Sequence, residues 1–309
     1  MEGDRCVELY LTSSEALYHG LIRHHSPAEK TAILRLVCQL TGLRKLDLRR
    51  NVVRQLPPEF VNLRELEHLN LGSNYLGSVP DVLRGLQRLR FLQLGNNDLA
   101  DLPGFLADFQ NLEQLALHKN LRLKSIDSLK GLTGLKALNL YFVNLLAFPA
   151  FVFEFHNLTT LSLWNVSRFP ESLEAFQALE FFTNCGGPSV RSLPPGFTKL
   201  KNLRMTRLFQ NNLEALPHDM DQLENLEQIS LYQNQLSRLP DSMARLKRLT
   251  KINLGWNQFE ILPAWLGELP QLQWLGVFEN PLKEPVQLPQ RAGLRVDREW
   301  PFSTVAAAC

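Results

Sequence analysis

The chain has 309 residues and a formal net charge of +2, with 33 lysines and arginines against 31 aspartates and glutamates. So small a charge argues against a nucleic-acid-binding protein. No uncharged apolar run approaches the roughly 20 residues of a membrane span, although hydrophobic residues make up 45% of the chain.

The cysteines and the N-terminal residues point to a location in the cell. The four cysteines stand at positions 6, 38, 185 and 309 and form no close pair typical of a disulfide framework or of a zinc site. The first residues lack a basic stretch followed by an apolar one, so we expect no secretory signal. These features predict a cytoplasmic protein with reduced thiols.

Two helices are predicted before residue 43, over 13–25 and 26–40. The second begins with Ser26-Pro27-Ala28-Glu29, in which serine and glutamate form a capping box and proline takes the first helical position. Its apolar side chains Ile33, Val37 and Leu40 recur at helical spacing and are expected to seal the first strand of the fold. We therefore predict a helical N-terminal cap over residues 1–42.

From residue 43 the chain repeats itself every 23 residues or so. The segment Leu66–Leu76 recurs as Leu89–Leu99, with leucines at the same places and an asparagine three residues after the third leucine. Leucine makes up 63 of the 309 residues, about a fifth. Eleven repeats begin at Leu43, Leu66, Leu89, Leu112, Leu135, Leu158, Leu179, Leu203, Leu226, Leu249 and Leu272.

The spacing within a repeat predicts its structure. In Leu-x-x-Leu-x-Leu the last two leucines lie two residues apart, so both point to one face of a short strand. The asparagine is expected to turn inward and satisfy backbone groups at the end of the strand. A proline then begins a short helical segment. The predicted fold class is α/β, a curved solenoid with a parallel β-sheet on its concave face and short helical or irregular segments on its convex side.

The middle of the array departs from this pattern. The inward asparagine is replaced by Val143, Val166 and Gly187, and Asn184 stands where a buried leucine is expected. In the other repeats it is present as Asn51, Asn74, Asn97, Asn120, Asn211, Asn234, Asn257 and Asn280. We interpret the departures either as functional or as drift without functional meaning.

The C-terminal end of the array is expected to be covered. Leu294 and Val296 lie two residues apart and predict one more short strand, with Trp300 and Phe302 closing the last repeat. One continuous domain is predicted, with the repeats over 43–294 and a C-terminal cap and tail over 295–309.

This unit resembles the intracellular leucine-rich repeats of the Ras-suppressor group, and similar repeats occur in plant Ras-group and bacterial proteins. The resemblance covers roughly residues 43–294 and implies a scaffold or adaptor in intracellular signalling, with a small GTPase among the partners to be considered. Relatives that are enzymes carry an attached catalytic domain, for which the segments outside the repeats are too short.

Large aromatic residues gather at strand positions that should face solvent. Clusters of this kind are typical of protein interfaces, although aromatics can also merely cover a sheet. The predicted partner-binding residues are Tyr141, Phe142, Trp164, Phe181, Arg207, Phe209, Tyr232, Trp256, Trp274 and Phe278. Self-association through this face is an alternative to capture of another protein.

A second patch, in the first repeat, is basic. It comprises Arg44, Lys45, Arg49 and Arg50, with only Asp47 opposing them on the strand. An acidic partner or a phosphate group would suit it, and an ordinary solvated end repeat is the alternative interpretation.

The sequence also offers candidates for functions other than protein binding. A small molecule or glycan could occupy an irregular pocket near Cys185, with Asn184 and Trp164 around it. Cys185 is also the best nucleophile candidate, with His118 as a distant base. No catalytic motif occurs in the sequence, so we predict no enzyme activity, no catalytic residue, no metal site and no cofactor.

Overall fold

The computed structural model describes residues 7–11, 22–145, 148–169, 172–187, 190–194, 196–283 and 293–298. Contacts divide the chain into two compact units, which we call unit 1 (residues 1–158) and unit 2 (residues 159–309). Each is described by itself.

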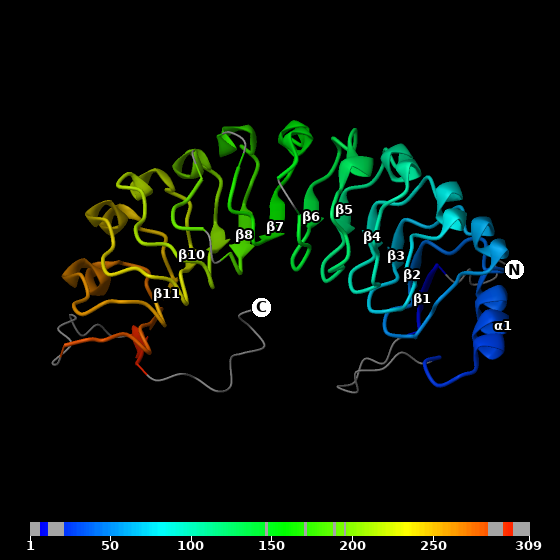
Figure 1. Ribbon diagram of the computed structural model, residues 1–309, viewed down its shortest axis with the longest axis horizontal. Helices are drawn as coiled ribbons and strands as arrows, with labels where there is room; N and C mark the ends of the chain where they lie inside the picture. The colour runs from blue at the N-terminus through cyan, green and yellow to red at the C-terminus, as the bar shows by residue number, and fades with distance from the viewer. Residues whose placement is uncertain are drawn as a thin grey trace, which may run out of the picture. The chain divides into compact units, whose positions relative to one another are not determined.

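Unit 1 contains a parallel sheet whose strands follow one another in chain order (Figure 1). Neighbouring strands pair at a fixed offset of 23 residues from β2 onward, so that Leu46, Leu69 and Leu92 are direct partners. The described strands are β1 (Glu8–Tyr10), β2 (Lys45–Asp47), β3 (His68–Asn70), β4 (Phe91–Gln93), β5 (Gln114–Ala116) and β6 (Ala137–Asn139).

Unit 2 repeats the arrangement with a second run of parallel strands. Its first two strands are five residues long, and the others have three. The described strands are β7 (Thr160–Trp164), β8 (Phe181–Cys185), β9 (Met205–Arg207), β10 (Gln228–Ser230), β11 (Lys251–Asn253), β12 (Trp274–Gly276) and β13 (Arg295–Asp297).

The strands confirm the predicted repeat and fold class. Each of the eleven predicted starts is followed two residues later by a strand, β2 to β12. The leucine at the middle of a strand is buried, as Leu69, Leu92 and Leu275 show with no exposed surface. Its neighbours on either side are half-exposed in β3 and β4. Alternation along the strand therefore separates a leucine core from an open face.

Short 3-10 helices link the strands on the opposite side of each unit (Figure 1). Proline precedes six of them, with φ between −61° and −72°, which confirms the predicted role of proline. The helices are η1 (Pro58–Asn62), η2 (Asp81–Gly85), η3 (Gly104–Asp108), η4 (Asp127–Leu129), η5 (Ala150–Glu154), η6 (Leu173–Ala175), η7 (Phe197–Lys199), η8 (Met220–Gln222), η9 (Asp241–Arg245) and η10 (Ala264–Glu268).

The N-terminal segment differs in part from its prediction. Helix α1 (Pro27–Val37) has the predicted capping box, since the Ser26 N–H donates to Glu29 and the Glu29 N–H donates to Ser26. Val37 is buried as predicted, but Leu40 is 36% exposed. The first repeat strand, β2, is covered by strand β1, which was not predicted, and α1 contacts η1 instead. Of the other predicted helix, residues 22–24 form a turn and 13–21 lie outside the described residues.

At the other end, the additional strand predicted from Leu294 and Val296 is confirmed as β13, which pairs with β12. Trp300, Phe302 and the tail lie outside the described residues. No helix in the described part of the chain is long and apolar enough to cross a membrane.

A ladder of buried asparagine side chains links successive repeats. Asn74 shows the pattern: its Oδ1 accepts from the backbone N–H groups of Asn51 and Val53, both at 3.0 Å. Its Nδ2 donates to the carbonyl oxygens of Leu48 at 3.0 Å and Leu71 at 2.9 Å. One amide thus satisfies backbone groups of two repeats, because an asparagine side chain has two donors and one strong acceptor. The prediction that these asparagines turn inward is confirmed.

In unit 2 another asparagine takes the place of a missing ladder residue. Gly187 has no side chain to serve Val166 of the repeat before it. Asn184 does so instead: its Oδ1 accepts from the Val166 N–H at 3.2 Å, and its Nδ2 donates to the Val166 carbonyl at 2.9 Å. The asparagine at a leucine position is therefore a substitute for the missing amide.

Replacing one ladder residue should destabilise the fold strongly. Asn234→Ala removes bonds to the Leu208 and Leu231 carbonyls and from the Leu213 N–H. Since buried backbone groups lose their partners, we expect a loss of about 2–4 kcal/mol in the free energy of unfolding, measured by urea denaturation. Asn225→Ala, which loses two exposed bonds, to the Lys201 carbonyl and from Arg248, is the control and should cost under about 1 kcal/mol because water replaces both partners. Equal effects of the two changes would contradict the role of the ladder.

Two polar residues at leucine positions should respond in opposite directions. Asn184→Leu restores the repeat pattern but leaves the Val166 backbone unsatisfied, so it should destabilise by about 1–3 kcal/mol. Thr206 is fully buried, and its hydroxyl has no hydrogen-bond partner among the described residues. Thr206→Val should therefore stabilise, by up to about 1 kcal/mol. Thermal unfolding of both variants measures the signs, and stabilisation by Asn184→Leu would refute the substitute role.

Candidate functional site

The open face of each sheet is built from three columns of side chains, one residue from every repeat in each column. The first and second columns are the outer positions of the strands, such as Gln228 and Ser230 of β10, whose middle residue Ile229 is buried. The third column is the residue that follows the last leucine of the strand, such as Tyr232. Because the strands pair in register, members of a column are neighbours about 4.8 Å apart.

In unit 2 the predicted binding residues are not equally exposed. Trp256 is 48% exposed and Phe181 37%, and the side chains of Trp164, Arg207, Tyr232 and Trp274 are half-buried. The expectation of an exposed side chain is wrong for Phe209, which is 5% exposed, and for Phe278, which is 2% exposed. The open face therefore combines accessible aromatic residues with others that belong to its packing.

Phe278 is buried because it lies across glycine. A Cβ atom added to Gly255 would come within 2.2 Å of its ring, and one added to Gly276 would come within 3.1 Å. The ring therefore packs directly on the backbone of neighbouring strands, which leaves little of it in contact with solvent. A glycine in the same column one repeat earlier was the available signal in the sequence. Phe209 is a similar case, because its neighbour in the third column one repeat earlier is the small residue Cys185.

Several of the remaining aromatic residues are held by specific contacts. The Tyr232 and Phe278 rings lie 6.0 Å apart. The Trp274 Nε1–H donates to Asp297 of β13 at 2.8 Å. Trp164 lies over Gly186, where an added Cβ would meet its indole at 2.2 Å. These contacts hold the rings in fixed orientations, which lowers the entropy cost of using them in an interface.

The two aromatic residues of unit 1 that were predicted to bind a partner, Tyr141 and Phe142, contact each other. The Tyr141 and Phe142 rings meet edge to face with centroids 4.6 Å apart, and both side chains are half-buried. In the same unit His118 lies across Gly95, whose added Cβ would come within 2.5 Å of the imidazole. Burial lowers the pKa of His118 below its usual value, so at neutral pH this side chain is an uncharged part of the face.

The predicted basic patch of the first repeat is largely neutralised by acidic side chains. Lys45 Nζ lies 2.5 Å from Glu8 of β1, and Arg49 Nε lies 3.0 Å from Asp47. Arg44 is 3.8 Å from Glu67 of the next repeat. Besides Asp47 on the same strand, β1 contributes Glu8, and Glu67 lies directly before β3. Arg50 lines a different pocket, with Arg23 and Lys119.

Neither a pocket lined by Cys185 nor a nucleophile at that position is supported. Cys185 is fully buried with its Sγ 3.5 Å from the Arg207 carbonyl oxygen, and Asn184 is 2% exposed. Cys185 and Asn184 therefore do not line an open pocket, whereas the neighbouring Gly186 and the predicted Trp164 do line a groove. Within the described ranges there is no group of three or more His, Cys, Asp or Glu side chains able to hold a metal ion.

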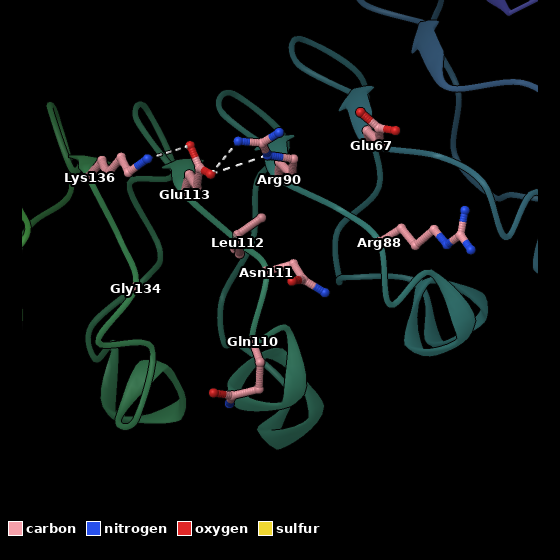
Figure 2. A pocket seen from close by; sticks show the side chains of 9 residues that line it. All are labelled: Glu67, Arg88, Arg90, Gln110, Asn111, Leu112, Glu113, Gly134 and Lys136. Atoms are coloured by element: carbon pink, nitrogen blue, oxygen red, sulfur yellow. Dashed lines mark hydrogen bonds and ion pairs between the residues drawn. The ribbon is translucent and has the colours of Figure 1, made fainter.

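One pocket of unit 1 lies among charged side chains along the edge where the strands begin (Figure 2). Arg90 approaches Glu113 to 2.5 Å, and Lys136 approaches the same carboxylate to 3.0 Å. Hydrogen bonds from Arg90 and then Lys136 lower the pKa of Glu113. Since the charges satisfy one another on an exposed surface, we interpret this network as structural, with a small contribution to stability.

The groove in unit 2 begins beside the predicted ligand location, but its extent and its glutamine lining were missed by the sequence analysis. It has a volume of about 450 Å³ and lies where the strands end, among the residues on either side of the asparagine ladder. Trp164 and Trp256, both predicted for the partner surface, also line this groove. Its other lining residues are mostly carboxamides. A recurrence of glutamine at the same two places in successive repeats was the signal available in the sequence.

Comparison with known proteins establishes the family. A family profile described as a leucine-rich repeat region matches residues 25–195, more than half of the chain. No curated protein sequence matches the chain.

Several solved structures share the fold. An internalin from Listeria monocytogenes is 23% identical with a TM-score of 0.65, covering 79% of this chain and 69% of that one. The leucine-rich repeat ectodomain of the Arabidopsis receptor kinase HAESA, in complex with a peptide hormone, is 24% identical with a TM-score of 0.60, covering 79% and 51%. The Drosophila Toll–Spatzle complex is 22% identical with a TM-score of 0.61, covering 81% and 35%. At these identities the likeness concerns the fold alone.

The unequal burial of the aromatic residues leads to a prediction on stability. Phe278→Ala should lower the free energy of unfolding by about 3–5 kcal/mol, because a fully buried ring leaves a cavity over Gly255 and Gly276. Phe181→Ala, at an exposed position, should cost less than about 1 kcal/mol. Chemical denaturation of both variants measures the difference. A small effect of Phe278→Ala would show that the ring does not support the sheet.

Proposed function

The chain belongs to the leucine-rich repeat family, and on that premise we propose that it is a protein-binding module. The proposed binding surface is the strand face of unit 2, which we define as Trp164, Phe181, Arg207, Tyr232 and Trp274. The observation that carries the proposal is the exposure of Phe181, 37%, on a face where the other four are half-exposed. An exposed aromatic side chain and an arginine on one open face are typical of interface anchors.

The rigidity of this face supports the proposal. Phe181 pairs with Thr160 and Met205 in register, and Arg207 pairs with Thr183 and Ser230. Each backbone is fixed by bonds to strands on both sides, so a partner would find the anchors already arranged. Two of the structures with this fold are complexes with a protein or peptide ligand, Toll with Spatzle and HAESA with a peptide hormone.

The class of partner and the cellular location of the protein can be proposed as well. We propose a small GTPase in intracellular signalling, on the resemblance of the repeats to the Ras-suppressor group. We also propose that this protein is cytoplasmic. The buried free thiols of Cys38 and Cys185 support this location, since reduced cysteines are the rule in that compartment. Burial raises the pKa of Cys38 to about 11, which keeps its thiol protonated and unreactive.

Affinity capture from a cytosolic fraction of the source cells tests the proposal. The native protein is compared with a Phe181→Glu/Arg207→Glu double variant and with Ile261→Glu, a control at a 72% exposed apolar side chain outside the strands. Circular dichroism first establishes that all three fold. We expect the partner to be retained by native protein and control and reduced at least tenfold by the double variant, as for loss of an anchor worth about 2 kcal/mol.

Purified partner, loaded with GDP or a GTP analogue if it is a GTPase, then repeats the comparison in a binding titration. Untagged copies of the chain itself in the captured material would indicate self-association through the same face. Identical capture by all three proteins would contradict the assignment of this face.

A further inference from the structure

Carboxamide side chains form two rows along the groove of unit 2. Gln210 and Gln233 directly precede ladder asparagines, and Asn212, Gln235 and Gln258 directly follow them. All five line the groove. Three successive repeats therefore place an amide on one or both sides of the ladder.

The backbone holds these rows in register. The Gln210 N–H donates to the Tyr232 carbonyl at 3.0 Å, and the Gln233 N–H donates to the Gly255 carbonyl at 2.8 Å. Behind them, the Gln235 N–H bonds to Leu213 and the Gln258 N–H to Leu236, at 2.9 and 2.8 Å. Successive amides in each row are consequently one strand spacing apart, about 4.8 Å.

The side-chain amides of the groove glutamines are available to a ligand. Gln210, Gln233, Gln235 and Gln258 are all exposed, and none makes a side-chain hydrogen bond within the part of the chain that the structure describes. The ladder asparagine between Gln233 and Gln235 differs from them. Asn234 is 3% exposed, and its side chain is hydrogen-bonded to backbone groups. The groove thus offers paired donors and acceptors to a ligand without disturbing the fold.

A tryptophan stands toward each end of the groove. At one end Trp164 lies over Gly186. At the other end Trp256 occupies the position directly before a ladder asparagine, in the same row as Gln210 and two repeats after it. Gly186 and Trp256 are separated by three strand spacings, about 14 Å. Trp256 is 48% exposed and has a φ of +55°. The same angle recurs at this position in other repeats, as in Gln210 and Gln233, so Trp256 is distinguished from them by its large exposed ring.

We propose that this groove binds a neutral oligosaccharide of three or four hexose rings. A carboxamide can donate to one sugar hydroxyl and accept from its neighbour, and an indole face packs against the C–H groups of a pyranose ring. Each hexopyranose adds a length close to one strand spacing, so consecutive rings meet consecutive amides. Glu279 is the single charged residue among the described lining residues, which fits an uncharged ligand.

An extended peptide suits the groove less well. Its side chains on one face recur every two residues, about 6.6 Å apart, which does not match amides that lie one strand spacing apart. The two rows are also built from side chains, whereas a peptide added to a sheet bonds to an open strand edge.

Titration with cellohexaose, maltohexaose and N-acetylchitohexaose, each followed by tryptophan fluorescence and calorimetry, tests the proposal. We expect saturable binding of at least one sugar by the native protein, with a blue shift of the fluorescence as Trp256 leaves solvent. Trp256→Ala and the double change Gln233→Ala/Gln235→Ala should each weaken binding at least tenfold. Trp256→Phe should keep most of it, because the ring remains. Gln55→Ala, an exposed glutamine in unit 1, is the matched control and should have no effect.

Three results would overturn the proposal. The first is no saturable response to any of the three sugars up to their solubility limits. The second is sugar binding that Trp256→Ala leaves unchanged. The third is binding of a neutral glycine–serine peptide, lost in the same variants, without binding of sugars. All the substituted side chains are exposed, and melting curves establish that the variants fold. Protein capture by the strand face is measured with different variants, so either proposal can fail alone.

Discussion

One buried amide per repeat holds the open edge of this fold together. At the end of a strand the chain leaves the sheet, and its N–H and C=O groups would be buried without partners. The Asn74 side chain bonds to two N–H groups of the preceding repeat and to carbonyl groups of both repeats. Because the same contacts recur in each regular repeat, the strands stay at constant spacing and in register. The columns of the open face and the rows of the groove both depend on this constancy.

The ladder also fixes an unusual backbone conformation next to it. In unit 2 the residues before the ladder position have φ near +55°, as in Gln210, Gln233 and Trp256. Only glycine adopts such angles without cost. The repeat thus holds one side chain per strand at the rim of the sheet, whatever its identity. Substituting these side chains changes the chemistry of the rim and leaves the hydrogen bonds of the ladder in place.

Periodicity predicted the fold well, because burial in a repeat depends on spacing alone. The strands, the inward asparagines and the proline-led 3-10 helices all follow from residue spacing. What spacing could not predict is how side chains of one repeat lie on another. Phe278 occupies an outward position, yet it is buried on Gly255. Glu8, far away in sequence, pairs with Lys45 only because an unpredicted strand adds to the sheet. Asn184 looked like a defect and proved to be the substitute for a missing ladder amide.

The central functional claim is that a partner binds the strand face of unit 2. Hydrogen–deuterium exchange of the protein with and without its purified partner tests it most directly. We predict slower exchange in segments covering Thr160–Trp164, Phe181–Cys185 and Met205–Arg207 when the partner is bound. Protection confined to the 3-10 helices on the opposite side, with these strands unchanged, would contradict the account.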